Sequence, residues 1–341
     1  MCQEDQSFMF ARDIGIDLGT ANVLIHVKGK GIVLNEPAVV AMDRNTGKVL
    51  EVGQAARQMV GRTPGNIEAI RPLKDGVIAD FDVTEAMLRY FIEKINVRGM
   101  FSKPRILVCC PTNITKVEQK AIKEAAEKSG GKRIYLEEEP KVAAVGAGMD
   151  IFQPSGNMII DVGGGTTDVA VLSMGDIVTS ESIKMAGDKF DQEILQYIKR
   201  KYKLLIGDRT SEDIKINVAT VFPEGRNESL DIRGRDLISG LPRTITVNST
   251  EIEEALREPV SLITQAAKSV LEKTPPELSA DIIDRGVIIT GGGALLHGLD
   301  QLLADELKVP VFISEDPMSA VAKGTGIMLG NIDKLPKKKI G

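Results

Sequence analysis

The chain has 341 residues, which is enough for two domains that each bury a core. Its hydrophobic fraction of 43% and charged fraction of 27% are ordinary for a soluble globular protein, and its net charge of −5 gives no support to nucleic-acid binding as the main role. No run approaches the roughly 20 apolar residues of a transmembrane helix, and Glu4 and Asp5 argue against a signal peptide. Cys109 and Cys110 are adjacent in a strand-like run, so we expect free thiols in a cytoplasmic protein.

The first third of the chain alternates strand and helix patterns, which is typical of α/β layers. Asp82, followed by Glu85, resembles a capping box and predicts a helix over residues 83–96. Thr115 predicts the start of a second helix, which ends at Gly130. Apolar runs predict strands at residues 13–18, 22–27, 31–34, 38–42 and 105–110.

The second half continues the alternation. A strand over residues 286–290 leads into three glycines, and Pro259 should kink or split one of the helices. Two segments, 33–65 and 182–245, do not follow this alternation of strands and helices. We expect them to be small subdomains inserted into the two halves. The apolar spacing predicts helices at residues 188–201, 250–273 and 294–307.

Two short segments share one pattern. Each is a run of β-branched residues that ends on a carboxylate, Asp17 in the first and Asp161 in the second, and then turns on glycine before the apolar pattern resumes. This is the signature of a β-hairpin, and its repetition predicts a duplicated domain with two turns that face each other across a cleft. Such turns offer backbone N–H groups to phosphate, and the two carboxylates can hold a hydrated Mg²⁺. The alternative is that each aspartate merely caps its turn.

A third glycine turn, residues 291–293, lies between a strand and a helix. No lysine that follows a glycine is itself followed by Ser or Thr, which excludes a Walker-type phosphate loop. No G-x-G-x-x-G opens a helix in a βαβ unit, so a Rossmann dinucleotide site is also unsupported. Phosphate binding by hairpin turns is the interpretation that remains.

Hydrolysis of a bound nucleotide requires a group that orients water in line with the γ-phosphate. Glu139 precedes Pro140 and a run of small apolar residues, a pattern that predicts a tight helix start able to aim a carboxylate into a cleft. The run of three acids at 137–139 is also typical of a solvated face. The residues alone leave both interpretations open.

Four stretches together resemble a known family: IGIDLGTAN (14–22), EEEPKVAAVGAG (137–148), DVGGGTTDVAV (161–171) and ITGGGALLHGL (289–299). They are similar to the ATPase core of the actin, Hsp70 and sugar-kinase superfamily, and within it to MreB, the bacterial actin family, closest to its MreB/Mbl group in Gram-positive rods. The resemblance covers residues 11–335. It implies a duplicated α/β core of the actin-like (ribonuclease H-like) fold that binds ATP and Mg²⁺ and hydrolyses ATP slowly.

The resemblance also implies a role for each motif. It places nucleotide contacts at Asp17, Gly19, Thr20, Ala21, Asn22, Gly163, Gly164, Gly165, Thr166, Thr167, Gly187, Asp188, Glu212, Lys215, Gly291, Gly292, Gly293, Ala294 and Leu295. Glu139 is implied to orient the attacking water, assisted by Asp161 and Thr166. Asp17 and Asp161 are implied to hold Mg²⁺ through water.

By the same resemblance the chain forms four subdomains and assembles with itself. The expected parts are domain IA at 11–32, 66–148 and 315–335, subdomain IB at 33–65, domain IIA at 149–185 and 246–314, and subdomain IIB at 186–245. Proteins of this family form head-to-tail protofilaments that pair in antiparallel fashion on the inner face of the plasma membrane. There they organise cell-wall synthesis and rod shape with the wall-elongation machinery.

A membrane contact is expected at the loop 96–104, which places Met100 and Phe101 between two basic residues. Exposed apolar residues beside bases can insert into an anionic lipid surface. Phe101 can instead pack into the core, but the resemblance to the family's membrane loop favours insertion. The N-terminal run 8–10 is a second apolar candidate.

Two other functions use the same core. An Hsp70-type chaperone would require a substrate domain after the core, and the chain stops shortly after the last adenosine motif. A small-molecule kinase would require a general base aimed at a substrate hydroxyl, and no further acidic motif suggests one. The sequence does not distinguish ATP from GTP.

Overall fold

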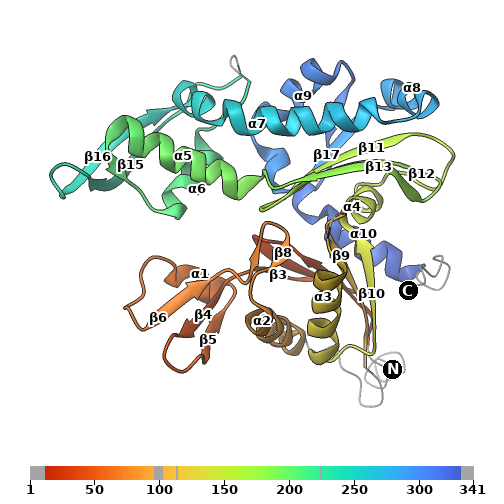
Figure 1. Ribbon diagram of the computed structural model, residues 1–341, viewed down its shortest axis with the longest axis horizontal. Helices are drawn as coiled ribbons and strands as arrows, with labels where there is room; N and C mark the ends of the chain where they lie inside the picture. Colours follow the sequence, from red (N-terminus) through yellow and green to blue (C-terminus); the bar gives the residue numbers. More distant parts are fainter. Residues whose placement is uncertain (1–11, 96–102, 113, 223–224, 332–341) are drawn as a thin grey trace, which may run out of the picture. The chain divides into compact units, whose positions relative to one another are not determined.

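The computed structural model describes residues 12–95, 103–112, 114–222 and 225–331. The chain divides into two compact units, Met1–Asp150 with Ser319–Gly341 as unit 1 and Ile151–Met318 as unit 2 (Figure 1). The expected division into four subdomains is finer than this and stays a prediction. No helix within the described ranges is long and apolar enough to span a membrane.

Unit 1 is built on a five-stranded sheet in the order β10-β9-β1-β2-β3. The hairpin β1–β2 is antiparallel, whereas β1, β9 and β10 are mutually parallel. A smaller sheet has the order β5-β4-β6. The strands are β1 (Ile14–Leu18), β2 (Asn22–Val27), β3 (Gly31–Pro37), β4 (Val40–Asp43), β5 (Val49–Val52), β6 (Ile67–Ile70), β7 (Leu73–Lys74), β8 (Val77–Ile78), β9 (Arg105–Cys110) and β10 (Arg133–Glu138).

Helices of unit 1 cover this sheet and bury its apolar residues. Met87, Leu88 and Phe91 of one helix join Ile16 and Val108 of the sheet in a single hydrophobic core. The C-terminal helix packs closely on β1, because a Cβ on Gly15 would lie 2.0 Å from Thr325 Oγ1. The helices are α1 (Gln54–Met59), α2 (Phe81–Lys94), α3 (Lys116–Lys128), α4 (Glu139–Gly146) and α10 (Ala320–Gly330).

Unit 2 repeats the sheet of unit 1 strand for strand. Its order is β13-β12-β11-β17-β18, with an antiparallel hairpin β11–β12 and parallel neighbours β17 and β18. This repetition confirms the predicted duplication of the α/β core. A second sheet has the order β14-β15-β16. The strands are β11 (Asn157–Val162), β12 (Thr167–Ser173), β13 (Asp176–Ile183), β14 (Leu204–Leu205), β15 (Ser229–Asp236), β16 (Pro242–Asn248), β17 (Val287–Thr290) and β18 (Val311–Ile313).

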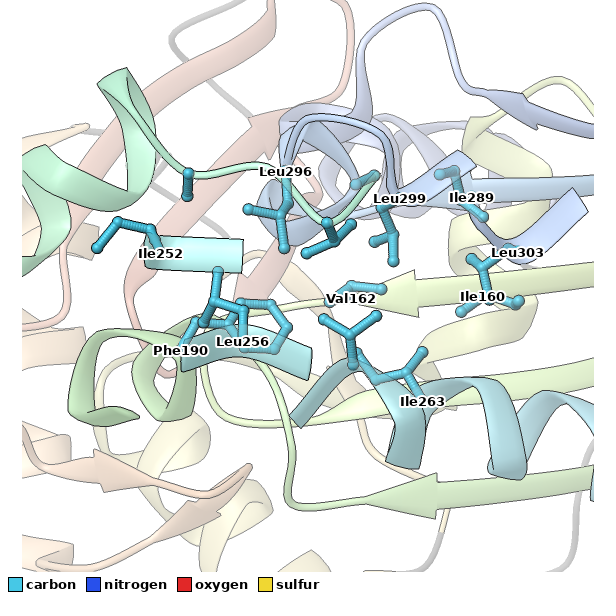
Figure 2. Close-up of a cluster of buried hydrophobic side chains, with 14 of the residues drawn as sticks. Ile160, Val162, Phe190, Ile252, Leu256, Ile263, Ile289, Leu296, Leu299 and Leu303 are labelled. Carbon is cyan, nitrogen blue, oxygen red and sulfur yellow. The ribbon is translucent and has the colours of Figure 1, made fainter. Parts of the chain in front are cut away.

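The core of unit 2 lies between its main sheet and its helices. Figure 2 shows side chains from β11, β17, α5, α7 and α9 meeting in one cluster, with Ile160, Val162, Phe190, Ile252, Leu256, Ile263, Ile289, Leu296, Leu299 and Leu303 labelled. The helices are α5 (Gly187–Tyr202), α6 (Asp208–Asn217), α7 (Ser249–Glu272), α8 (Pro276–Arg285) and α9 (Leu299–Leu307), and two short 3₁₀ turns are η2 (Gly292–Leu295) and η3 (Pro317–Ser319).

One helix cap follows the sequence prediction and another differs. Thr115 caps α3 with a full capping box, in which Thr115 Oγ1 accepts from the Glu118 N–H. The predicted box at Asp82 is wrong, because Asp80 caps α2 by accepting from the Val83 N–H at 3.1 Å. Asp80 has the extended backbone that an N-cap requires, which places Asp82 inside the first turn.

Two further predictions about helices need correction, one on the continuity of α7 and one on the start of α9. We expected Pro259 to kink or split α7. A split is wrong, since α7 continues through Pro259, and the buried side chains of Leu256, Val260 and Ile263 hold the helix on the core; the kink stays a prediction. The helix expected from Ala294 begins instead at Leu299. Gly298 has a φ of 81°, a left-handed conformation that separates η2 from α9.

Candidate functional site

In unit 1, Asp17 lies near the end of β1, just before the hairpin turn. The register pairs Leu18 with Val23, so the turn comprises residues 19–22 with Asn22 at the start of β2. Asp17 is buried, and burial raises the pKa of its carboxyl to about 7. The hydroxyl of Thr20 accepts a hydrogen bond from the Gly76 N–H at 3.2 Å and fixes the turn.

A group of acids gathers beside Asp17 at the carboxyl ends of the parallel strands. Burial raises the pKa of the Cys109 thiol well above its usual range, and the nearby negative charges of Asp17 and Glu139 raise it further. Both carboxylates therefore lie close to one thiol. The predicted helix start is confirmed, because Glu139 is the first residue of α4. In open α/β sheets ligands bind at this edge.

The three acids at 137–139 do not form a solvated face, since all three are partly buried. Lys141 is buried on α4 and its Nζ lies 3.6 Å from Glu137 Oε2. The ammonium group offsets one of the clustered charges. Sequence reasoning missed this lysine, and no helical spacing signals the pair, because Glu137 lies in β10 and Lys141 on α4.

In unit 2, the turn of the β11–β12 hairpin is held by the start of α5. The Gly163 N–H donates to Thr166 O at 2.9 Å, which closes the turn. The N–H groups of Gly187 and Asp188 donate to the carbonyls of Gly163 and Gly164 at 3.2 and 2.8 Å. A trans peptide directs its N–H opposite to its C=O, so the N–H groups of Gly164 and Gly165 point away from α5. Two neighbouring N–H groups on one side of a loop form an anion-binding concavity.

The third glycine turn packs directly on the end of β11. Gly291 has a φ of 81°, and a Cβ there would lie 2.3 Å from Val162 O and 2.5 Å from Asp161 Oδ1. A Cβ on Gly293 would lie 2.3 Å from Val162 Cγ1. Only glycine permits this approach. The turn therefore sits next to the buried carboxylate of Asp161.

A charged cluster joins α5 and α6 near the same loop. Lys215 Nζ donates to Gly187 O at 3.1 Å and to Asp191 Oδ2 at 2.8 Å. Burial raises the pKa of Asp191 to about 6, although Lys215 lowers it, and Glu212 and Asp188 raise it further. Asp191 was missed by sequence reasoning. It lies one turn beyond Gly187, and this spacing on an amphipathic helix is a weak signal.

Unit 2 thus brings together the predicted residues of the second phosphate motif, of α5, of α6 and of the third glycine turn. Ala294 is buried and Leu295 is 57% exposed. Unit 1 brings together Asp17, Glu139 and the first turn. Met100 and Phe101 lie outside the described residues. Within the described ranges no group of three or more His, Cys, Asp or Glu side chains could hold a metal ion.

Comparison with known proteins places the chain in a family. The family model described as MreB/Mbl protein matches residues 11–337. The cell shape-determining protein Mbl of Bacillus subtilis (strain 168) is 80% identical over 332 residues, covering 97% of this chain and 100% of the relative. The cell shape-determining protein MreB of Escherichia coli (strain K12) is 50% identical over 330 residues, covering 95% of each chain.

Comparison with solved structures leads to the same family. MreB 5 of Spiroplasma citri bound to AMPPNP superposes with a TM-score of 0.91 at 41% identity, covering 95% of this chain and 97% of that one, and the ADP-bound form has the same TM-score. The MamK double helical filament, at 18% identity and a TM-score of 0.78, shows the shared fold. The duplicated sheets and these matches define an actin-like protein. The chain belongs to the MreB/Mbl family. These relatives give no support to a chaperone or a small-molecule kinase.

Proposed function

We propose that this chain binds ATP with Mg²⁺, hydrolyses it slowly and polymerises into membrane-associated filaments that organise cell-wall synthesis and rod shape. The observation that carries the proposal is the β11–β12 turn, whose two N–H groups face away from α5 while its carbonyls are anchored on that helix. Membership of the MreB/Mbl family and a relative solved with an ATP analogue support it.

The proposed nucleotide contacts come from residues in both halves of the sequence. The N–H groups of Gly164 and Gly165 would bind phosphate oxygens, and Asp17 and Asp161 would hold Mg²⁺ through water. The chemistry that Mg²⁺ would supply there is neutralisation of phosphate charge. The buried, partly protonated carboxyl of Asp17 fits this role, because a nearby divalent cation favours its charged form.

Glu139 orients the attacking water, with Asp161 and Thr166 as assisting groups. As the first residue of α4, the glutamate is held at a fixed position beside Asp17 and Cys109. Lys141 takes up the charge of Glu137, which leaves Glu139 to act on water. The remaining predicted contacts on α5, α6 and the third glycine turn bind the nucleoside.

Steady-state phosphate release tests this assignment. Glu139→Gln should lower kcat by roughly 100-fold with little change in nucleotide affinity, since it removes a group needed at the chemical step. Glu138→Gln, on the neighbouring N-cap residue, is the matched control and should retain most of the activity. Equal activity of Glu139→Gln and wild type would reject the role. Titration with ATP and GTP in parallel settles which nucleotide is preferred.

The filament and membrane parts of the proposal have their own test. Electron microscopy with ATP should show filaments, and these should pellet with vesicles that contain anionic lipid. Phe101→Glu should lower pelleting, because a charge at the apolar loop opposes insertion. Many weak contacts along one filament act together, so unpolymerised chains should bind lipid poorly. Unchanged pelleting of the Phe101→Glu filaments would remove this loop from the proposal.

A further inference from the structure

Helices α5 and α6 lie side by side in unit 2, and Asp191 of α5 joins them through two hydrogen bonds (Figure 1). The buried Ser211 hydroxyl donates to Asp191 O at 2.5 Å, and Lys215 Nζ donates to Asp191 Oδ2 at 2.8 Å. Ser211 and Lys215 are one helical turn apart, so they lie on the same face of α6. Asp191 therefore determines where the ammonium group of Lys215 lies.

This ammonium group reaches the first turn of α5, which is bonded to the β11–β12 turn. Lys215 Nζ donates to Gly187 O at 3.1 Å. The same peptide group carries the Asp188 N–H, which donates to Gly164 O at 2.8 Å. Because the C=O and the N–H of a trans peptide point in opposite directions, this one peptide group connects Lys215 to the turn.

The next peptide group extends the same line of hydrogen bonds. Gly164 O belongs to the peptide that carries the Gly165 N–H, and this N–H points away from α5. Each hydrogen bond that a carbonyl accepts polarises its peptide and makes the N–H on the far side a better donor. The carboxylate of Asp191, the ammonium of Lys215 and two peptide groups thus form one relay that ends at the Gly165 N–H.

Stability does not account for the Asp191 carboxylate. Its Oδ1 is buried and has no hydrogen-bond partner in the part of the chain that the structure describes. A largely buried ion pair contributes little net stability, because taking its charges out of water costs about as much as their attraction returns. Phe190, Ile194 and Ile214 already join the two helices in the hydrophobic core. The pair of Asp191 and Lys215 is better explained by what it positions.

We propose that Asp191 is a positioning residue for phosphate binding, because it holds the Lys215 ammonium group where the relay to the Gly165 N–H begins. The inference rests on the proposed nucleotide binding, in which the Gly165 N–H meets a phosphate oxygen. Asp191 acts through Lys215 and touches no part of the nucleotide. Loss of its charge leaves the N–H groups of the turn in place but less firmly oriented and less polarised.

Lys215 has a second expected task, contact with the nucleoside, and the alternative is that Asp191 serves that contact alone. The two tasks differ in the ligand that they affect. A carboxylate that serves only the nucleoside contact would matter equally for adenosine and for ADP. The relay ends at a phosphate donor and matters for ADP. The direct path through two hydrogen-bonded peptide groups favours the relay.

Ligand binding to the isosteric Asp191→Asn variant tests the relay. In isothermal titration at pH 7.5 with Mg²⁺ present, Asp191→Asn should weaken ADP binding about fivefold and adenosine binding less than about twofold, since a neutral amide holds the ammonium group less strongly. Asp213→Asn, on the exposed face of α6, is the matched control and should bind both ligands like wild type. In a Lys215→Met background Asp191→Asn should have no further effect, because it acts only through the lysine.

Hydrogen exchange tests the positioning without any ligand. In the nucleotide-free chain the Asp188 N–H should exchange about fivefold faster in Asp191→Asn than in wild type, because its peptide group is held less firmly. The amides of β17, in the same unit, should exchange at the wild-type rate. Circular dichroism and thermal melting establish that each variant is folded.

The pH dependence of ADP binding gives a readout that a purely structural role would not change. Burial raises the pKa of Asp191 to about 6, whereas Lys215 lowers it and Glu212 and Asp188 raise it. Below that pH wild type also carries a neutral Asp191. The difference in ADP affinity between wild type and Asp191→Asn should therefore shrink from about fivefold at pH 7.5 to less than about twofold at pH 5. Because both chains are compared at each pH, protonation of ADP itself cancels.

Three outcomes would overturn the inference. If wild type binds ADP and folded Asp191→Asn binds it equally well, the relay is rejected while the proposed nucleotide binding stands. Equal weakening of adenosine and ADP, with unchanged exchange of the Asp188 N–H, would show that Asp191 serves the nucleoside contact instead. If wild type binds neither ADP nor ATP, the proposed nucleotide binding and the relay fall together.

Discussion

The two glycine turns occupy equivalent places in two equivalent sheets, yet they are held in different ways. In unit 2 the carbonyls of Gly163 and Gly164 accept from the start of α5, which directs the following N–H groups outward. In unit 1 the turn is held by a side chain, because Thr20 Oγ1 accepts a hydrogen bond from the Gly76 N–H. The backbone of one turn and the side chain of the other are thus the fixed parts.

The acids beside the two turns differ as well. Asp17 lies at the end of a strand parallel to that of Cys109, whose thiol both Asp17 and Glu139 influence, and the pKa of Asp17 is raised to about 7 by burial. Asp161 instead lies under the third glycine turn, with Gly291 packed against its carboxylate. The two halves thus share one strand order but differ in how the turn and its neighbouring acid are held. The second turn is fixed through its carbonyls on α5, and the first lies beside a buried carboxyl whose pKa is raised to about 7.

The largest expected effect concerns the packing that is found in unit 2. Gly291→Ala should lower the free energy of unfolding by about 3 kcal/mol, because it combines an unfavourable φ with a Cβ that overlaps Val162 O. Gly292→Ala is the matched control, since nothing lies within 4 Å of its Cβ position. Chemical denaturation of both variants measures the difference. Equal stabilities would show that the turn shifts freely away from β11.

The second prediction concerns the charge of Asp17. Its pKa is about 7 in the folded chain, against an ordinary value of 3.8 that applies to the unfolded chain. Between these two values the folded chain keeps a proton that the unfolded chain has lost. The free energy of unfolding therefore falls as pH rises from about 4 to 7. Asp17→Asn removes this dependence. Without nucleotide or Mg²⁺, it should therefore stabilise the protein at pH 8 by roughly 2 kcal/mol and have little effect at pH 4.

An aspartate of opposite character provides the control for that measurement. The pKa of Asp43 is lowered by the N–H groups of Thr46 and Asn45, which donate to its carboxylate. Asp43→Asn should therefore destabilise the protein more at neutral pH than at pH 3. Thermal melts across the pH range compare the two variants. Destabilisation by Asp17→Asn at pH 8 would contradict the view that its buried charge is unfavourable.

Local features of the fold were predictable from sequence because their causes are local. The strand pattern and glycine turn that follow Asp17 and Asp161 predicted both hairpins, and Thr115 with Glu118 predicted the cap of α3. The continuation of α7 through Pro259 was not predictable, because the packing that maintains the helix comes from residues distant in the chain. The choice of Asp80 over Asp82 as cap depends on backbone conformation at a single residue.

The same distinction applies to the candidate site. The pattern predicted a role for Glu139 and the glycine turns, but the position of both Asp17 and Glu139 around Cys109 follows from the parallel arrangement of β1, β9 and β10, which no local signal encodes. The pairing of Lys215 with Asp191 likewise joins two helices whose relative position depends on the core. Sequence thus predicts which groups are present, whereas tertiary packing determines which of them meet.

The smallest expected effects compare the hydroxyl beside each turn. Thr167 is fully buried and donates to Met185 O at 2.5 Å, so Thr167→Val should cost about 1.5 kcal/mol by leaving that carbonyl without its partner. Thr20→Val removes the 3.2 Å bond from Gly76 and should cost only about 0.5 kcal/mol, since the loop can shift to expose that N–H to water. Valine keeps the shape of threonine, so urea denaturation of the two variants isolates the hydrogen bonds. A larger loss for Thr20→Val would mean that unit 1 has the more rigid turn, and the contrast between the two halves would have to be reversed.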